Sequence, residues 1–506
     1  MTAVVGPSLD EALNSNDTFD SLNPANGDVV GTYPIHTKDD VDAAVARGRE
    51  AAQWWGALSF KERAEYLLTW RSVITRRIAQ LAEVSHRETG KPHSDAQLEI
   101  VLAIDHIAWA AKNAKKVLGQ QKVKSGLLMA NQAAYVEYKP LGVVGVIGPW
   151  NYPVFTPCGS IAYALAAGNA VVFKPSEYTP GVGAWLAHTF TEVVGGRPVF
   201  QVVTGLGETG NALCTAGVDK LAFTGSGPTG KKVMAACAEN LTPVIIEAGG
   251  KDSLIVDEDA DLEKAAEAAL WAGMANAGQT CIGTERVYVH EKVFEPFLSE
   301  ILSQAKDLRA GADGAAKIGP ITMPSQINVI RSHVQDAVDK GATVALGGPD
   351  AIGDRFVQPT ILTHVPEDST EITEETFGPT LAVNPVTSMD EAIERTNATR
   401  YGLAGAVFSK KRGMEIARQI RSGMTSVNAV TAFAGVPSLP FGGVGESGFG
   451  RIHGPDGLKE FTYAKSITRQ KFKPLLNLIS FDRDDATDAK AMKLVTMLHG
   501  GKQTLK

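Results

Sequence analysis

The sequence predicts an α/β protein with more than one lobe. From about residue 141, short apolar runs alternate with Gly/Pro/Ser turns and helical segments, which is typical of βαβ units in a doubly wound parallel sheet. A second alternating series begins after about residue 250. The chain has 506 residues, more than one hydrophobic core holds efficiently. We therefore expect a doubly wound parallel-sheet domain followed by a second α/β domain of parallel or mixed sheet.

The region before the first series is expected to be mostly helical. Apolar residues recur at helical spacing over 39–55, 61–90 and 93–118, and Asp39 or Asp40 is a candidate N-cap of the first helix. The next segment, "ANQAAYVEYKPLG", alternates in polarity and predicts a strand or a hairpin.

The βαβ series shows where a ligand should bind. Its strands are expected in "LGVVGVIGPW", "NAVVFKPSE", "VFQVVTGLGETG", "DKLAFTGSGPTG" and "TPVIIEAGGKDSLIVD", and those of the second series include "ERVYVH", "ATVALGG" and "TSVNAV". Ligands bind open parallel sheets at the carboxyl ends of the strands, and the unusual residues of this chain follow those ends. We expect the functional site there.

Charge and hydropathy exclude several classes of function. A net charge of −7 provides no basic excess to neutralise phosphates, so we expect no nucleic-acid partner. The first basic residue is Lys38, so no basic signal or transit pattern is recognised, and no apolar stretch approaches the ~18 residues of a membrane span. We expect a cytoplasmic protein without an integral membrane segment.

The four cysteines point to one unusual thiol. No pair forms a C-x-x-C motif and no Cys/His group has zinc-ligand spacing, so we expect neither a metal site nor a disulfide. Cys158, Cys214 and Cys237 lie in small, apolar surroundings typical of packed cysteines. Cys281 lies in "NAGQTCIGTERV" among small residues that leave room for a substrate. It is either a structural thiol or a nucleophile.

Three motifs suit a dinucleotide, and each has a simpler explanation. "FTGSGPTGKKV" (223–233) places Gly, Ser and Thr where a strand meets a helix, which suits a phosphate but also an ordinary βα turn. "GLGETG" (205–210) carries the same ambiguity. Lys174 and Glu177 in "NAVVFKPSE" could hold a ribose, and the carboxylate would favour NAD over NADP, although a surface ion pair is the alternative.

Two further motifs could carry chemistry. Asn151 in "GPWNYP" is either a helix N-cap or a donor to a developing oxyanion. Glu247 in "IIEAGGKD" ends an apolar run and is either a general base or a solvated turn residue. "EETFGPT" (374–380) and "LPFGGVGESGFGR" (439–451) are Gly/Pro/Phe turns of undecided role.

Taken in order, these pieces resemble the aldehyde dehydrogenase superfamily. "PWNYP", "GNAVVFKPSE", "FTGS", "EAGGK", "GQTC", "EETFGP" and "PFGGVGESGFGR" follow the order of that family from about residue 149 to 451, and "NPANGDVVGTYP" (23–34) resembles its usual start. "EAGGKD" departs from the commoner E-L-G-G-K-[ST/N] but keeps the carboxylate. Seven motifs in one order make the resemblance specific.

The resemblance implies a mechanism and a set of site residues. Cys281 would attack an aldehyde, Asn151 and the Cys281 backbone N–H would hold the oxyanion, and Glu247 would activate the water that hydrolyses the resulting thioester. Lys174 and Glu177 would hold the ribose of NAD and Ser226 the pyrophosphate. The other expected cofactor residues are Trp150, Gly207, Phe223, Gly249, Glu375 and Phe377. The expected substrate pocket is Tyr152, Phe155, Thr280, Ile282 and Phe441, with Phe433 and Val436 nearby.

The apolar pocket favours a medium- or long-chain aliphatic or an aromatic aldehyde. "SLPFGGVGESGFG" and "HGPDGLKEFT" also resemble the branch of the family that takes such substrates. The alternatives are a semialdehyde dehydrogenase, such as one for succinate semialdehyde, a CoA-acylating relative, and a catalytically silent binding module. Glu247 argues against the CoA-acylating relative, which generally lacks that carboxylate.

The resemblance also implies the domain organisation. We expect an NAD-binding domain from 1–120 plus 141–247 and a catalytic domain from 248–461. Strands in 121–140 and 462–474 would form a small β oligomerisation element that gives a homodimer or homotetramer, and 475–506 would be a C-terminal arm.

Overall fold

The computed structural model describes residues 17–474 and 476–501. The expectations for 1–16, 475 and 502–506 fall outside this range. The chain divides into two compact units, Met1–Val117 with Pro140–Tyr463, and Leu118–Lys139 with Ala464–Lys506. Both expected α/β domains lie within the first unit.

The first unit begins with a hairpin and four helices. These elements are β1 (Thr18–Leu22), β2 (Val29–Pro34), α1 (Lys38–Ala57), α2 (Phe60–Arg76), α3 (Ile78–Thr89) and α4 (His93–Leu118). The sequence suggested Asp39 or Asp40 as the N-cap of α1, but neither residue is the cap. Thr37 is the cap, because its side chain accepts from the Asp40 backbone while the Asp40 side chain bonds back to Thr37. The predicted helix 61–90 is two helices, which break at Arg77 where the backbone leaves helical geometry (φ −108°, ψ 21°).

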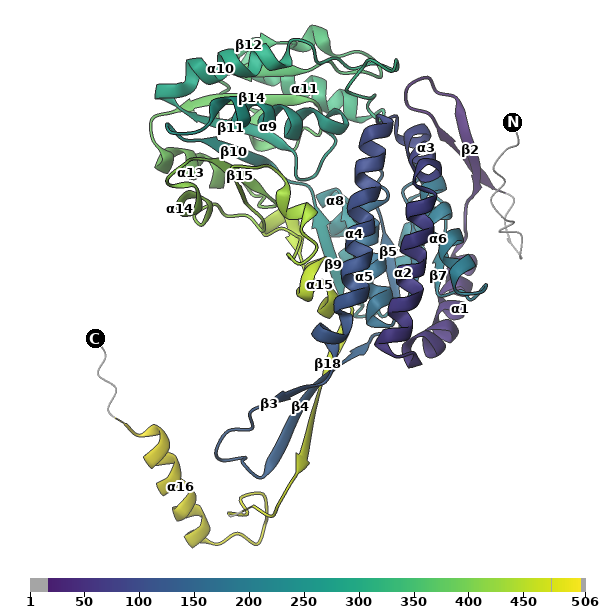
Figure 1. Ribbon diagram of the computed structural model, residues 1–506, viewed down its shortest axis with the longest axis vertical. Coiled ribbons are helices and arrows are strands. Elements are labelled where there is room, and N and C mark those ends of the chain that lie inside the picture. Colours follow the sequence, from purple (N-terminus) through teal and green to yellow (C-terminus); the bar gives the residue numbers. More distant parts are fainter. Residues whose placement is uncertain (1–16, 475, 502–506) are drawn as a thin grey trace. The chain divides into compact units, whose positions relative to one another are not determined.

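A six-stranded sheet forms the first α/β layer. Its order is β17-β9-β8-β5-β6-β7, and all pairs except β17–β9 are parallel. The strands are β5 (Val143–Ile147), β6 (Ala170–Lys174), β7 (Phe200–Val202), β8 (Lys220–Gly225), β9 (Val244–Ala248) and β17 (Gly448–Phe449). The helices between them are α5 (Phe155–Ala167), α6 (Pro180–Val193), α7 (Gly207–Thr215) and α8 (Gly227–Ala238). Figure 1 shows the long helices α2 and α4 in front of this sheet. Every residue of β6 is buried, as a strand covered on both faces requires.

A seven-stranded mixed sheet forms the second α/β layer. Its order is β12-β13-β14-β11-β10-β15-β16, with only β12 antiparallel. The strands are β10 (Asp252–Val256), β11 (Thr284–His290), β12 (Thr343–Leu346), β13 (Thr360–Thr363), β14 (Thr380–Val386), β15 (Gly405–Phe408) and β16 (Ser426–Val427). The helices are α9 (Leu262–Met274), α10 (Glu291–Ala305), α11 (Gln326–Asp339), α12 (Thr370–Thr373), α13 (Met389–Asn397) and α14 (Gly413–Ala417). Helix α15 (Gly454–Glu460) follows β17 and packs on α5 of the first layer.

A short connection fixes how the two sheets face each other. Strand β9 of the first sheet ends at Ala248 and β10 of the second begins at Asp252. Three intervening residues span at most about 10 Å. The carboxyl edge of the six-stranded sheet must therefore lie against the amino edge of the seven-stranded sheet.

The second unit holds a three-stranded antiparallel sheet and a helix. Strands β3 (Gln121–Val123), β4 (Gln132–Pro140) and β18 (Thr462–Gln470) pair in the order β18-β4-β3, and α16 (Asp485–His499) follows. No residue of α16 is buried. Across the described residues of both units, every helix is too short or too polar to cross a membrane.

Candidate active site

The turn before Cys281 has an unusual backbone. Cys281 lies between the 3-10 turn η1 (Ala275–Gly278) and β11. Asn276, Ala277 and Gly278 all have left-handed conformations, with φ of 52°, 57° and 71°. A Cβ on Gly278 would lie 2.0 Å from the Gly378 carbonyl oxygen, so both the backbone and the space require glycine. Residues in this region of conformational space cost free energy and cluster at functional sites.

Cys281 differs from the other cysteines in its exposure. Cys158, Cys214 and Cys237 are buried, which confirms the packing role predicted for them. Cys281 keeps accessible surface at the end of the left-handed turn. Cys281 is therefore partly accessible, unlike the other three cysteines.

Asn151 bonds to the same turn. Its Nδ2 donates to the Gln279 carbonyl oxygen at 2.9 Å. The Asn151 carbonyl oxygen accepts from Asn276 Nδ2 at 3.0 Å and from Lys91 Nζ at 2.7 Å. Helix α5 begins only at Phe155, so Asn151 is not its N-cap. An amide has two N–H groups, so the second one of Asn151 remains available to an oxyanion.

Glu247 is a buried carboxyl beside the thiol. It lies in β9 and is 2% exposed. Among the described residues, neither carboxylate oxygen has a hydrogen-bond partner of ordinary geometry. Burial raises the pKa of Glu247 to about 7, although the nearby Thr224 hydroxyl and Cys281 thiol lower it in part. A carboxyl with a pKa near neutrality can both accept and release a proton, so the turn-residue interpretation does not fit this environment.

The surroundings keep the Cys281 thiol protonated. Burial by neighbouring atoms raises its pKa well above the ordinary value, and the carboxylates of Glu247, Glu375 and Asp252 raise it further. The thiol therefore needs an acceptor for its proton, and Glu247 is the carboxyl whose charge affects it most.

Two predicted cofactor sites lie at the carboxyl edge of the six-stranded sheet. Lys174 ends β6, is 5% exposed, and has its Nζ 3.7 Å from Glu177 Oε2. Burial lowers the pKa of Lys174, which Glu177 opposes. Ser226 precedes α8 but its Oγ donates to Thr229 Oγ1 at 3.0 Å, so no side chain caps the first backbone N–H groups of that helix. Such N–H groups are donors for a phosphate.

Trp150, Glu375 and Phe377 come together from opposite lobes. The Trp150 and Phe377 rings meet edge to face at 5.6 Å. Glu375 Oε1 accepts from the Gly250 backbone at 3.2 Å, and a Cβ on Gly249 would lie 1.8 Å from that oxygen. Gly249 is therefore required for Glu375 to approach this closely. Burial, helped by the charge of Glu285, raises the pKa of Glu375 to about 8.

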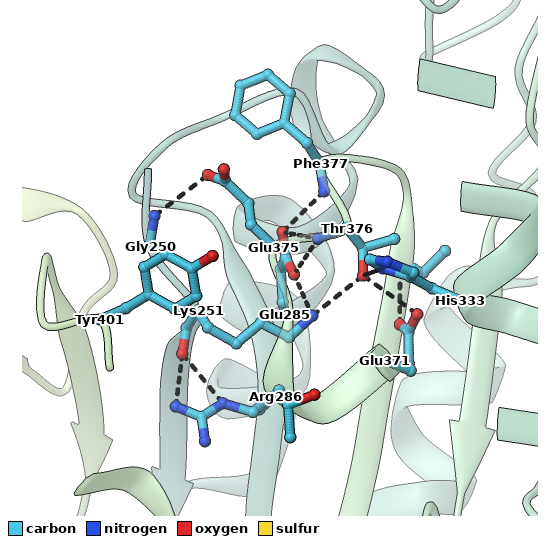
Figure 2. Close-up of polar contacts among 12 residues, drawn as sticks. Gly250, Lys251, Glu285, Arg286, His333, Glu371, Glu375, Thr376, Phe377 and Tyr401 are labelled. Carbon is cyan, nitrogen blue, oxygen red and sulfur yellow. Dashed lines mark hydrogen bonds and ion pairs between the residues drawn. The ribbon is translucent and has the colours of Figure 1, made fainter. Parts of the chain in front are cut away.

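A buried polar network that the sequence analysis did not identify holds the Glu375–Phe377 loop (Figure 2). Lys251 pairs with Glu285, and its Nζ also donates to Thr376 Oγ1 at 3.1 Å. Glu285 accepts from the Thr376 and Phe377 backbone N–H groups, each at 2.9 Å. Both charges were visible in "EAGGKD" and "GTERV", but their pairing depends on the adjacency of β10 and β11.

Three more side chains, those of His333, Glu371 and Arg286, extend the network around Thr376 and Lys251. The Thr376 hydroxyl lies 3.1 Å from His333 Nδ1 and 3.2 Å from Glu371 Oε2. Arg286 donates through Nε to the Lys251 carbonyl oxygen at 3.0 Å. Figure 2 shows these side chains converging on Thr376 and Lys251, with the Phe377 ring pointing away from them. The Lys251–Glu285 ion pair thus holds the Glu375–Phe377 loop in place, and the ring of Phe377 remains free to contact Trp150.

The predicted pocket residues fall into two contacting groups. The Tyr152 hydroxyl lies 3.0 Å from Thr280 Oγ1, directly beside the nucleophile turn. Phe155 and Phe441 are buried and both contact the ring of His453, at 5.4 Å between centroids in each case. Ile282 is partly exposed next to Cys281.

Two predicted cofactor residues make no contact that defines a role. Phe223 is buried, and its ring fills the space that Cβ atoms on Gly225 and Gly230 would need. Gly207 opens α7, and a Cβ there would meet no described heavy atom within 4 Å. Among the residues that the structure describes, no group of three or more His, Cys, Asp or Glu side chains is arranged to hold a metal ion.

A doubly wound parallel sheet joined to a second α/β sheet, with a partly accessible cysteine where the two sheets meet, is an arrangement suited to a dinucleotide-dependent oxidoreductase. Comparison with protein families gives a narrower class. The model of the aldehyde dehydrogenase family matches residues 12–467, and the chain belongs to this family. Its members use a catalytic cysteine and NAD or NADP.

Relatives and solved structures agree with this assignment. A candidate succinate-semialdehyde dehydrogenase [NADP(+)] of Mycolicibacterium smegmatis is 39% identical over 88% of this chain and 87% of its own. A 4,4'-diapolycopene aldehyde oxidase of Methylomonas is 35% identical over 89% and 85%. An NAD-dependent aldehyde dehydrogenase from Sinorhizobium meliloti superimposes with a TM-score of 0.86 at 33% identity, covering 90% of this chain and 92% of that one. The chain is therefore an aldehyde dehydrogenase with an α/β fold shared across the family.

Proposed function

We infer that this chain oxidises an aldehyde to the carboxylic acid through a thioester on Cys281, with Glu247 as the base and Asn151 as an oxyanion donor. One observation carries the proposal. The buried Glu247 carboxyl and the Cys281 thiol each alter the pKa of the other, and the thiol keeps accessible surface. Covalent catalysis needs a nucleophile with a proton acceptor close enough to interact with it.

The first half of the reaction builds the covalent bond. The thiol proton passes to the Glu247 carboxylate, the sulfur attacks the aldehyde carbon, and an S–C bond forms as the carbonyl electrons move to oxygen. The free N–H of Asn151 and the Cys281 backbone N–H donate to that oxygen. A nicotinamide positioned by Glu375 and Phe377 would supply a hydride acceptor for this carbon, and the loss of hydride would leave a thioester on Cys281.

The second half breaks the bond. Glu247 first releases the thiol proton to solvent, and its carboxylate then takes a proton from water as the water oxygen attacks the thioester carbon. The S–C bond then breaks, the carboxylic acid leaves, and the thiol regains a proton. A carboxyl with a pKa of about 7 suits both proton transfers near neutral pH.

The residues present fit a dinucleotide. Lys174 and Glu177 would hold the ribose, the uncapped N–H groups after Ser226 would hold the pyrophosphate, and Glu375 and Phe377 would position the nicotinamide end. Glu177 would repel a 2′-phosphate, which favours NAD, whereas the Mycolicibacterium relative is named for NADP. Roles for Gly207, Gly249, Trp150 and Phe223 follow only from the family resemblance.

The NAD preference can be tested at Glu177. We expect Glu177→Gln to raise kcat/KM with NADP relative to NAD by about tenfold, since one charge repulsion is removed. Steady-state kinetics with both cofactors measure the ratio. Glu192→Gln, which removes another partly exposed glutamate, is the matched control and should leave the ratio unchanged. An unchanged ratio in Glu177→Gln would contradict the assignment of Glu177 to the ribose.

The substrate class rests on the pocket residues. Phe155 and Phe441 are apolar and buried, which supports a medium- or long-chain aliphatic or an aromatic aldehyde. A semialdehyde is the alternative, supported by the name of the Mycolicibacterium relative. The side chain of Lys91, whose Nζ lies 4.4 Å from the centroid of the Tyr152 ring, is already paired with Glu99, so it is a poor candidate for holding a substrate carboxylate.

The three-stranded sheet supports a homodimer or homotetramer. Every residue of β3 is exposed, and most of β18 is exposed as well. Edge strands of this kind offer unpaired backbone groups to a second chain. We propose that β3, β4 and β18 form the oligomerisation element, and that the six- and seven-stranded sheets are the NAD-binding and catalytic domains.

A panel assay tests the function directly. NADH formation would be followed at the absorbance of the reduced nicotinamide with aliphatic, aromatic and carboxylated aldehydes, with and without CoA. We expect turnover to the free acid, and we expect Cys281→Ala to abolish it while NAD still binds. Cys214→Ala removes a buried thiol and is the matched control. Formation of acyl-CoA in preference to the acid, or turnover in Cys281→Ala, would overturn the proposal.

A further inference from the structure

His453 is buried with both ring nitrogens unsatisfied. It is 1% exposed, and among the described residues neither Nδ1 nor Nε2 has a hydrogen-bond partner. A buried polar group without a partner destabilises the folded state, and such groups in native proteins call for an explanation. The neutral imidazole has one donor and one acceptor to offer.

The backbone of His453 is also strained. Its φ of 64° and ψ of 165° lie in a region that glycine occupies almost alone. A non-glycine residue held in this region destabilises the folded state. The missing hydrogen-bond partners and the strained backbone are thus two unfavourable contributions to stability at the one residue that places an imidazole at this position.

The imidazole contacts two residues of the predicted substrate pocket. Its ring contacts Phe155 and Phe441, each at 5.4 Å. Gly159 lies one helical turn beyond Phe155 on α5, and a Cβ there would lie 2.5 Å from His453 Nε2. The nitrogen edge therefore occupies space on the face of α5 that Phe155 shares. The Tyr152–Thr280 contact joins the segment just before this helix to the Cys281 turn.

The neighbouring histidine is already satisfied. His106 stacks at 3.8 Å from His453, and its Nε2 lies 2.9 Å from the Ala434 carbonyl oxygen. Burial lowers the pKa of His106 to about 4, and burial with His106 lowers that of His453 well below its ordinary value. Both rings are therefore neutral near neutral pH, and only His453 has unused hydrogen-bonding capacity.

We propose that His453 is a specificity-determining residue that hydrogen-bonds an uncharged oxygen, a hydroxyl or carbonyl, on the substrate several bonds from the aldehyde. This inference rests on the proposed function and refines its substrate class. The preferred substrate has an apolar stem that packs on Phe155 and Phe441 and a polar group beyond it. A neutral imidazole within aromatic rings suits an uncharged oxygen better than a carboxylate.

Matched substrates test the proposal. The full-length enzyme would be assayed with straight-chain ω-hydroxyaldehydes of increasing length against unsubstituted aldehydes of equal length. At one length the hydroxyl should raise kcat/KM about tenfold through KM, the size of one neutral hydrogen bond. His453→Gly relieves the backbone and removes the ring, and it should lose this gain, so that the hydroxylated and the unsubstituted aldehyde have equal kcat/KM. His453→Asn retains a donor and should keep part of it.

A binding measurement separates this test from the test of function. Calorimetry on Cys281→Ala would compare straight-chain diols with mono-alcohols, and the diol of matching length should bind about tenfold more tightly. If no aldehyde is turned over, the proposed function fails but this comparison still decides the role of His453. Gly159→Ala displaces the imidazole and should lower the preference if His453→Gly does not fold. Equal binding of diol and mono-alcohol, or a preference that survives His453→Gly, would overturn the inference.

Discussion

The two sheets of the first unit present opposite ends of their parallel strands to the same site. In the six-stranded sheet, Asn151, Lys174 and Glu247 lie at or just beyond the carboxyl ends of β5, β6 and β9. In the seven-stranded sheet, Cys281 and Glu375 precede the amino ends of β11 and β14. The direct passage from β9 to β10 forces this arrangement, because a chain that leaves one sheet at its carboxyl edge enters the next at its amino edge.

The carboxyl edge of the six-stranded sheet and the amino edge of the seven-stranded sheet position their side chains in different ways. At the carboxyl edge, side chains extend from strand ends and helix N-termini whose positions the sheet already determines. At the amino edge, the loops need added support. The Cys281 turn is held by left-handed residues, and the Glu375 loop is held by the Lys251–Glu285 pair. Perturbations of the two edges should therefore have different consequences.

The largest effect is expected from breaking the ion pair at the amino edge. Lys251→Met leaves Glu285 buried without its cation, and removing one partner of a buried pair costs about 3–5 kcal/mol. Urea unfolding would measure the loss of stability. Lys292→Met breaks the exposed pair with Glu258 and is the matched control, which should change stability by less than about 1 kcal/mol.

A double variant sharpens that comparison. Lys251→Met with Glu285→Gln removes both charges, so it should recover a substantial part of the stability lost in Lys251→Met alone. Equal losses for Lys251→Met and Lys292→Met would show that the pair does not support the loop.

The next effect concerns the turn that carries the thiol. Gly278→Ala introduces a Cβ 2.0 Å from the Gly378 carbonyl oxygen and a left-handed alanine. A displacement of about 1 Å at a reacting group costs about a hundredfold in rate, so we expect kcat/KM to fall by at least that factor. Gly314→Ala is the control, since a Cβ there meets nothing within 4 Å. Wild-type kinetics in a folded Gly278→Ala protein would contradict the tight geometry of the turn.

The sequence predicted the carboxyl edge better than the amino edge. Strand ends can be located from apolar runs and turn residues, so Asn151, Lys174 and Glu247 were identified together with their sheet. The Lys251–Glu285 pair was not predicted, because it depends on which strands become neighbours. The N-cap of α1 was misplaced because a capping box uses both Thr37 and Asp40. His453 was quoted only within a family motif, since neither its strain nor its missing partners can be seen without coordinates.

The smallest effect is a pH-dependent change in stability at the carboxyl edge. Burial raises the pKa of Glu247 to about 7 in the folded protein, whereas the unfolded chain ionises near the ordinary value of about 4.5. Between these two pH values the unfolded state loses its proton and the folded state keeps it, so the free energy of unfolding falls as pH rises.

The full difference corresponds to about 3 kcal/mol, and a buried glutamine amide, itself imperfectly bonded, should recover about 2 kcal/mol of it. Glu247→Gln should therefore be about 1 kcal/mol less stable than the wild type near pH 4.5, become more stable than the wild type through pH 7 and keep a constant advantage of about 2 kcal/mol above it, as measured by urea unfolding at each pH. Glu258→Gln, at an exposed ion pair whose carboxyl pKa is lowered by hydrogen bonding to Lys292, should show no such gain. A pH-independent difference for Glu247→Gln would mean that Glu247 ionises freely, and its role as a base tuned by burial would have to be abandoned.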